Sequence, residues 1–259
     1  MEKITGKNNE LIKGVKKLLS SSKERNAQGV FVLEGARLVF DVLNSLYEVK
    51  FFMITENALS KYEKKARLMI SKSEKSYIIS EDISDRLSDT KNSQGVFAVC
   101  RINPEKDNKI NPDGKYIMLD NVQDPANLGA IVRTAEALGT DGVIVSGGCD
   151  IYNPKSLRAA MGSMLRIHIM QIDNSEEFLE NARKKGLSLF ATVPDSSAAR
   201  ITDSDFSGGV ICVIGNEANG VSEKIIRLCD EKITIPMLGK AESLNASVAA
   251  AITMWEMLR

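Results

Sequence analysis

Three polar segments in the second half of the sequence carry the side chains best suited to chemistry. The first, LDNVQDPANLGAIVRTAEALG, runs from residue 119 to residue 139 and contains Asn127 and Arg133 in an expected helix. A helix cap and a solvated arginine would explain these two residues. They would not explain Gly129, because a glycine inside a helix costs about 1 kcal/mol relative to alanine unless something must approach its backbone closely. The segment is therefore a candidate for ligand contact.

The other two segments are turns that follow expected strands. Residues 213–222, VIGNEANGVS, place two glycines, two asparagines and a glutamate at a strand end, where glycines let a ligand reach the backbone. Residues 235–258, IPMLGKAESLNASVAAAITMWEML, carry Ser243 and Asn245 in a polar turn before an alanine-rich helix. Taken alone, the first turn is explained equally well as a tight turn before a helix capped by Ser222. An alanine-rich helix is usually core, so any function would lie in the turn before it.

All three segments start at the carboxyl end of an expected strand, and ligands of open parallel sheets bind along that edge. We expect strands that begin at residues 115, 142, 166, 187, 209 and 231, with the sequences KYIMLDNV, GVIVSG, RIHIMQI, LSLFATV, GVICVIG and EKITIPM. Near-continuous apolar strands of this kind are buried on both faces of a parallel sheet. The pattern alone favours a doubly wound α/β domain.

A second module precedes this sheet. Residues 103–114, NPEKDNKINPDG, combine two prolines and a glycine with charged and asparagine residues, which is typical of a domain boundary. We therefore predict domains at 1–105 and 106–259. In the first, the apolar runs FVLEG, KFFMIT, SYIIS and GVFAVC alternate with the helical stretches ELIKGVKKLL and KYEKKARLMI. This alternation predicts a small α/β module.

Several kinds of chemistry are disfavoured by what the sequence lacks. It has neither a GxxxxGK[ST] nor a GxGxxG motif, which argues against kinases, ATPases and dehydrogenases. His168 is the single histidine and lies in an expected strand, so a histidine-based triad or metal site is disfavoured. The cysteines form no CxxC pair and are expected to be reduced thiols; they are Cys100, Cys149, Cys212 and Cys229. We expect no metal.

Charge permits an RNA partner without demonstrating one. The formal net charge is zero, but residues 1–105 hold 18 Lys and Arg against 14 Asp and Glu, and the remainder is correspondingly acidic. Basic residues outnumber acidic ones seven to three within the first 25 positions, which suits phosphate contact and a solvated helix face about equally. No apolar stretch approaches the roughly 18 residues of a membrane span, and no signal peptide is evident, so we expect a cytoplasmic protein.

The three segments, in this order, resemble the signature motifs of the SpoU (TrmH-like) branch of the SPOUT RNA methyltransferases. The matching stretches are QDPANLGAIVRTAEALG, IGNEANG and IPMLGKAESLNASVAAAI, and the resemblance covers roughly residues 115–259. NPKSLRAAMGSMLRIHI looks like the region after the family's second strand. Upstream, KITGKNNELIK and SSKERNAQGVFVLEGARLV resemble the substrate-binding domain, similar to the L30e/L7Ae fold, that many rRNA-modifying members carry.

The resemblance implies more than the residue pattern does. It implies an α/β SPOUT catalytic domain with a C-terminal trefoil knot behind an L30e-like domain, and a homodimer. It also implies S-adenosylmethionine as cofactor and a ribose 2′-hydroxyl as acceptor, on 23S rRNA in preference to tRNA because minimal tRNA members lack the front domain. The alternatives are a tRNA ribose 2′-O-methyltransferase and a catalytically silent RNA-binding or ribosome-assembly factor.

Site residues follow from the same resemblance. The positions that match the family's polar active site are Asn127, Arg133, Glu217, Ser243 and Asn245, and their joint presence argues against a silent factor. The cofactor would be held by Thr192, Gly215, Asn216, Ile235, Met237 and Leu244. The candidates for RNA contact are Lys23, Arg25 and Arg37.

The resemblance also suggests roles for the charged members of this group. Arg133 is the family's proposed activator of the hydroxyl, but a guanidinium that stays protonated better suits a grip on phosphate and on the developing alkoxide. We expect Glu217 to orient Arg133 or Asn127, because a carboxylate that faces RNA is otherwise repulsive.

Overall fold

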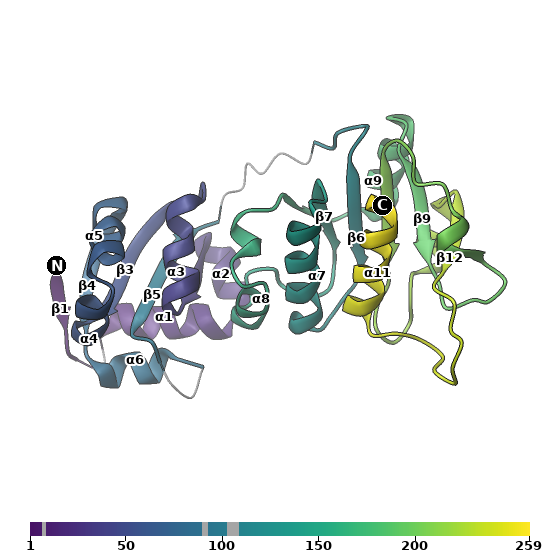
Figure 1. The fold of residues 1–259 in the computed structure, drawn as a ribbon. Coiled ribbons are helices and arrows are strands. Elements are labelled where there is room, and N and C mark those ends of the chain that lie inside the picture. The colour runs from purple at the N-terminus through teal and green to yellow at the C-terminus, as the bar shows by residue number, and fades with distance from the viewer. Residues whose placement is uncertain (7–8, 90–92, 103–108) are drawn as a thin grey trace. The chain divides into compact units, whose positions relative to one another are not determined.

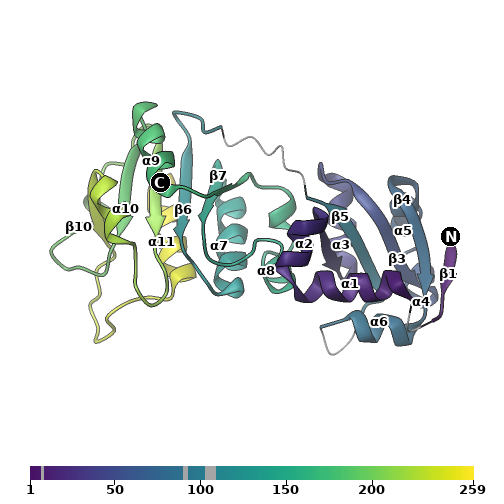
Figure 2. The same cartoon turned by 180° about the vertical axis from the view of Figure 1, so that it is seen from behind.

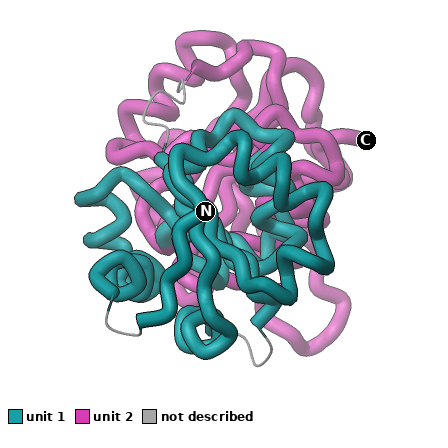
Figure 3. The backbone as a smooth tube through the Cα atoms, turned by 90° about the vertical axis from the view of Figure 1, so that its left-hand side faces the viewer, with its two compact units in different colours: residues 1–105, 150–165 teal, residues 106–149, 166–259 magenta. Residues whose placement is uncertain are grey.

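A computed structural model of the chain describes residues 1–6, 9–89, 93–102 and 109–259, which form two compact units. Unit 1 comprises residues 1–105 and 150–165, and unit 2 comprises residues 106–149 and 166–259 (Figure 3). The predicted boundary between residues 105 and 106 lies outside the described residues and stays a prediction. The sequence pattern did not indicate that residues 150–165, which follow a strand of the catalytic half, belong to unit 1.

The described part of unit 1 is built on a mixed five-stranded sheet in the order β1-β4-β3-β5-β2 (Figure 1). Its strands are β1 (Glu2–Ile4), β2 (Val30–Glu34), β3 (Val49–Thr55), β4 (Ser73–Ile79) and β5 (Val96–Arg101). β5 runs antiparallel to both β2 and β3, whereas β1, β4 and β3 are parallel. Each of the four predicted apolar runs falls within one of β2 to β5, apart from at most one terminal residue, so this α/β module is confirmed.

Short helices connect these strands. They are α1 (Glu10–Ser20), α2 (Ser22–Gln28), α3 (Ala36–Asp41), α4 (Glu56–Lys61), α5 (Glu63–Lys72) and α6 (Glu81–Leu87), with the 3-10 turn η1 (Val42–Asn44). Residues 150–165 add α8 (Pro154–Ala159) and the 3-10 turn η2 (Ser163–Leu165). In α1 the buried residues Ile12, Val15 and Leu18 recur every three positions and form one apolar stripe. Asn9 caps this helix by accepting a hydrogen bond from the backbone amide of Leu11.

The described part of unit 2 is built on a seven-stranded sheet in which every pairing is parallel, as the apolar strands predicted. The order is β10-β12-β9-β11-β6-β7-β8. The strands are β6 (Lys115–Asp120), β7 (Gly142–Ser146), β8 (Ile169–Ile172), β9 (Ser188–Thr192), β10 (Ala199–Arg200), β11 (Val210–Ile214) and β12 (Glu231–Thr234). Because β11 is inserted between β6 and β9, the order is not that of a doubly wound sheet. The knot stays a prediction.

Helices cover both faces of this sheet (Figures 1 and 2). They are α7 (Pro125–Leu138), α9 (Ser175–Lys184), α10 (Glu223–Leu228) and α11 (Ala246–Leu258), with the 3-10 turn η3 (Ile201–Asp203). α7 and α11 contact each other on one face, and α9 and α10 contact each other on the opposite face. The buried residues Gly129 of α7 and Ala250 of α11 are small, which suits close approach of two helices.

Two sequence predictions about single residues have different outcomes. His168 is not a strand residue: β8 begins at Ile169, and the His168 carbonyl accepts a hydrogen bond from the Val143 amide at 2.9 Å. All four cysteines are free thiols, and burial raises the pKa of Cys100 and Cys212 well above the ordinary range. No helix within the described ranges has the length and apolarity that a membrane crossing needs.

Candidate active site

A cavity of about 530 Å³ opens in unit 2 beside the carboxyl ends of β9, β11 and β12. All six residues that the sequence assigned to a cofactor line it: Thr192, Gly215, Asn216, Ile235, Met237 and Leu244. Three of the five predicted catalytic residues line it as well: Glu217, Ser243 and Asn245. The fold therefore gathers residues that lie up to 53 positions apart in the sequence around one cavity.

The parallel sheet explains this convergence. β12, β9 and β11 are adjacent and parallel, so their carboxyl ends lie along one edge. Thr192 is the last residue of β9, Gly215 follows β11, and Ile235 follows β12. The Thr192 hydroxyl donates a 2.7 Å hydrogen bond to the carbonyl of Val213, which fixes its side chain against β11.

The turn after β11 needs glycine at its first position. A β-carbon on Gly215 would stand 2.0 Å from the Gly220 carbonyl carbon and 2.1 Å from the Val221 nitrogen. Asn216 closes the turn, because its side-chain oxygen accepts hydrogen bonds from the amides of Ala218 and Asn219 at 2.9 and 3.1 Å. No larger residue fits at position 215 without moving the cavity wall.

A polar cluster joins this turn to the start of α7 and α11. The Asn127 side chain, 7% exposed, donates a hydrogen bond to Glu217 Oε1 at 2.9 Å and accepts one from Asn245 Nδ2 at 3.0 Å. Glu217 also accepts hydrogen bonds from the backbone amides of Gln123 and Asp124, both at 3.1 Å. Asn127 does not line the cavity itself; it lies behind two residues that do.

These contacts set the charge state of Glu217. Partial burial by itself raises the pKa of the carboxyl, but the hydrogen bonds from Asn127 and from backbone amides outweigh burial and lower the pKa from its ordinary value of 4.5. Glu217 is therefore a carboxylate at neutral pH whose oxygens are already engaged. This state suits a residue that orients Asn127 better than it suits a general base.

The residue that caps the N-terminus of α7 is not the one that the sequence indicated. Asp124, not Asn127, is the N-cap, and its side chain accepts a hydrogen bond from the Ala126 amide at 2.9 Å. Proline at the next position explains this register, because Pro125 has the backbone angle of a first helical residue and no amide hydrogen to satisfy. The shift places Asn127 within the first turn, where its side chain is available to Glu217 and Asn245.

Arg133 lies apart from the cavity. It is exposed on α7 and, within the part of the chain that the structure describes, forms no hydrogen bond or ion pair. It lies six positions after Asn127, which corresponds to about 9 Å along the helix and about 120° around it. The two residues therefore face different surroundings. Ser243 lines the cavity with an exposed side chain.

The three candidates for RNA contact have different environments. Lys23 on α2 and Arg37 on α3 are exposed, and neither forms an ion pair within the described ranges. Arg25 is 3% exposed and its guanidinium is bound to Asp150. The structure does not support RNA contact by Arg25, because reaching a phosphate would require breaking a buried ion pair.

Sequence reasoning missed several residues that line the cavity. They are Val193, Pro194, Ile214, Ala218, Asn219, Gly220, Val221, Glu223, Ile226, Glu242, Ala246 and Ala249. Val193 and Pro194 directly follow β9, so the rule that ligands bind at carboxyl ends of parallel strands could have found them. Ile226 lies on α10, and no sequence signal distinguishes it from an ordinary core residue.

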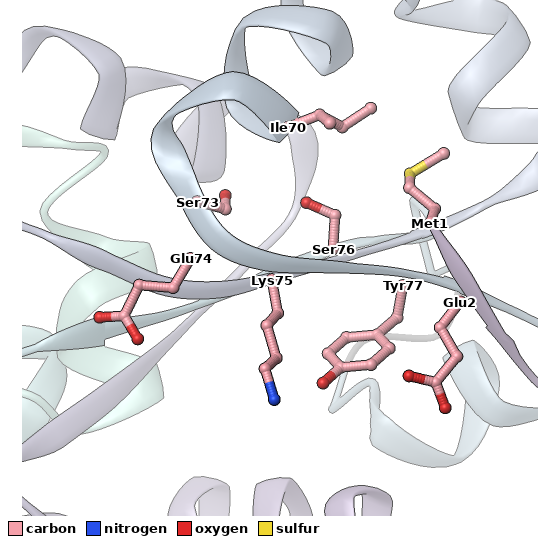
Figure 4. Close-up of a pocket in the computed structure, with 8 residues that line it drawn as sticks. All are labelled: Met1, Glu2, Ile70, Ser73, Glu74, Lys75, Ser76 and Tyr77. Atoms are coloured by element: carbon pink, nitrogen blue, oxygen red, sulfur yellow. The ribbon is translucent and has the colours of Figure 1, made fainter.

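A second pocket, of about 280 Å³, lies in unit 1 beside β1 and the start of β4 and contains no predicted site residue (Figure 4). Lys75 and Tyr77 leave β4 on one side and Ser76 leaves it on the other, as expected for a strand. The Ser76 hydroxyl is buried without a hydrogen-bond partner within the described residues.

Comparison with known proteins places this site in a family. The SpoU rRNA methylase family model matches residues 114–255, and the model of an MRM3-like substrate-binding domain matches residues 9–98. This chain belongs to the SpoU rRNA methylase family. The SpoU match contains every predicted catalytic and cofactor residue, and the substrate-binding match contains the three candidates for RNA contact.

SpoU relatives resemble the chain over its full length. The chain is 31% identical to the 23S rRNA (guanosine(2553)-2′-O)-methyltransferase RlmP of Bacillus subtilis, with 99% of each protein covered. An AdoMet-bound rRNA methyltransferase from Sinorhizobium meliloti superimposes with a TM-score of 0.88 at 29% identity, covering 99% of this chain and 97% of the other. The SpoU methyltransferase AviRb of Streptomyces viridochromogenes, in complex with AdoMet, gives a TM-score of 0.86 at 28% identity, with 97% of each covered.

Proposed function

We propose that the chain is an S-adenosylmethionine-dependent methyltransferase that methylates a ribose 2′-hydroxyl of 23S rRNA. The observation that carries this proposal is the cavity at three parallel strand ends, lined by all six expected cofactor residues and bordered by the Glu217, Asn127 and Asn245 cluster. The full-length similarity to RlmP supports rRNA as the substrate.

The lining of the cavity fits this cofactor. Its volume falls within the roughly 300–1,000 Å³ typical of small-molecule sites. Ile235, Met237 and Leu244 offer apolar surface for the adenine ring, while the turn at Gly215 leaves backbone groups accessible to polar atoms. When bound, the cofactor supplies a methyl group on a sulfonium, which is electrophilic without help from a metal.

The chain's own residues bind the reacting groups and orient them. Asn127 holds Glu217 and Asn245 at the cavity wall through the two hydrogen bonds described above. Ser243, two positions before Asn245, also lines the cavity. We assign Arg133 to the RNA: its guanidinium grips the phosphate next to the target ribose and stabilises the developing alkoxide, while phosphate or water takes the proton.

Arg133 can play this part if two copies of the chain combine. Val248 and Trp255 are 46% and 60% exposed and lie two turns apart on α11, so they form an apolar stripe on one face. We propose that this stripe is the homodimer contact. α11 packs on α7, which carries Arg133. We further propose that the dimer places Arg133 of one copy at the cavity of its partner.

Unit 1 would select the RNA. Its match to a substrate-binding domain and its exposed Lys23 and Arg37 support this division of labour. The same domain favours rRNA over the alternative of tRNA. We place the enzyme in the cytoplasm, where its proposed substrate is found.

Titration calorimetry with S-adenosylmethionine, before and after treatment with a chelator, tests the cofactor. We expect binding that the chelator leaves unchanged. Mapping of 2′-O-methyl groups in rRNA and tRNA from cells with and without the gene tests the substrate, and one 23S rRNA site should lose its methyl group on deletion. Loss of a tRNA methyl group instead would favour the tRNA alternative, and cofactor binding without any lost methyl group would contradict the assigned reaction.

A further inference from the structure

Helix α2 has no apolar anchor. Its sequence, SKERNAQ, contains a single apolar residue, Ala27, which is exposed. The one buried side chain of α2 is that of Arg25. A helix of seven residues is far below the length at which helices are stable in isolation, so contacts outside the helix must hold it.

The Arg25 guanidinium supplies such contacts. Nε and Nη2 donate hydrogen bonds to Asp150 Oδ2 at 2.8 and 2.6 Å, and Nη1 donates one to the Leu18 carbonyl at 2.5 Å. Leu18 belongs to the last turn of α1. One buried side chain thus ties α2 to α1 and to Asp150, and a lysine could not make this set of bonds because it lacks the forked donors.

Asp150 belongs to a segment that is itself fastened to unit 1. This segment, residues 150–165, lies in the sequence between β7 and β8 of the catalytic half. Tyr152 stacks on Phe31 of β2 with ring centroids 4.6 Å apart, and Arg158 forms an ion pair with Asp89 at 2.7 Å. Both α2 and α8 contact β2.

We propose that Asp150 is a positioning residue for RNA binding: through Arg25 it holds α2 so that exposed Lys23 faces the substrate. The inference rests on the proposed function, in which unit 1 binds rRNA. Arg25 then acts by holding α2, not by touching phosphate. The catalytic half of the sequence thereby contributes to the RNA-binding surface.

Removing one partner of a buried ion pair is strongly destabilising, because the remaining charge stays buried and uncompensated. In Asp150→Ala, α2 should therefore open, and the affinity for a 23S rRNA transcript should fall about tenfold while the affinity for S-adenosylmethionine stays within about twofold. Hydrogen exchange of the α2 amides should accelerate in the same variant. Asp85→Ala on α6 is the matched control and should behave like the wild type, because Asp85 is exposed and, within the described ranges, has no hydrogen bond or ion pair to α2.

A double variant separates anchoring from direct contact. Arg25→Met combined with Asp150→Leu replaces the ion pair by apolar side chains, a change that often preserves stability. If Arg25 only anchors α2, the double variant should recover RNA affinity to within about threefold of wild type and slow the exchange of α2 again.

Two results would overturn the proposal. The first is an Asp150→Ala variant whose RNA affinity and hydrogen exchange of the α2 amides are both unchanged. The second is a double variant in which the α2 amides exchange slowly again but RNA binds as weakly as it does to Asp150→Ala. The second result would return Arg25 to the list of RNA contacts. Failure of the wild-type protein to bind the transcript would instead contradict the proposed function, and the α2 exchange rates would still decide whether Asp150 anchors the helix.

Discussion

At the scale of the residue, Arg133 is separated from the cofactor cavity by the geometry of α7. It is exposed, and it lies about 120° around the helix from the buried Asn127. A side chain in this position can meet RNA without touching the cofactor. Loss of Arg133 should therefore affect the transfer step and leave cofactor binding intact.

Arg133→Ala should lower the single-turnover methylation rate by about a hundredfold or more, the scale of one lost transition-state donor, with little change in cofactor affinity. Arg133→Lys should recover little of this rate, because a point charge lacks the guanidinium fork. Rapid-quench kinetics beside calorimetry would measure both quantities. Normal turnover in Arg133→Ala would remove the residue from the catalytic list, and lost cofactor binding with normal chemistry would move it to the cavity.

At the scale of the element, the loop after β6 and the turn after β11 are bonded together along their length. Asp120 accepts a hydrogen bond from the Ser222 amide at 2.8 Å, and the Asn121 carbonyl accepts one from Asn216 at 2.9 Å. The Glu217 carboxylate adds its bonds to the start of α7. The cavity wall and the helix that carries Arg133 therefore depend on one ionised carboxylate.

This dependence predicts a response to acid. The pKa of Glu217 is lowered in the folded protein, so its contribution to stability is present above the unfolded value of about 4.5 and is lost as the pH falls through the lower folded value. The free energy of unfolding, measured with urea, should therefore fall less between about pH 6 and pH 3 in Glu217→Gln than in wild type. Glu180→Gln on α9, exposed and away from the cavity, is the control. Equal pH dependence in Glu217→Gln and wild type would contradict this role.

At the scale of the whole molecule, the chain is not divided as simply as its sequence suggests. Residues 150–165 leave the parallel sheet after β7, join unit 1, and return before β8. A cut between residues 105 and 106 would deprive Arg25 of Asp150 and Phe31 of Tyr152. Separate expression of the two sequence domains would therefore damage unit 1.

The proposed dimer predicts that two inactive copies can repair each other. Leu244→Trp should fill the cavity but keep Arg133, whereas Arg133→Ala should keep the cavity intact but remove the arginine. If Arg133 serves the partner's cavity, random reassortment of an equal mixture should restore about a quarter of the wild-type sites. If it serves its own cavity, the mixture should stay inactive. Methylation assays on the mixture, with sedimentation to verify the dimer, distinguish these outcomes.

The sequence by itself determined most of the strands, and its resemblance to a family supplied nine of the residues that line the cavity. Strands buried on both faces must be continuously apolar, so β6, β7 and β11 were recognisable from composition. Parallel strands place their carboxyl ends on one edge, so the turns at Gly215 and Ile235 could be assigned to one site before their distance was known.

Only the tertiary structure decided which long-range partner each polar residue takes. Lys23 and Arg25 are both cations on one short helix, yet Lys23 is exposed and Arg25 is buried against a carboxylate 125 positions away. Likewise, Asn127 could be a helix cap by local pattern, but the bond that it donates to Glu217 and the one that it accepts from Asn245 make it the centre of a cluster. Local spacing specifies which polar groups are available on an element. Whether such a group is buried beside a distant partner depends on how the strands and helices pack, and no short stretch of sequence contains that information.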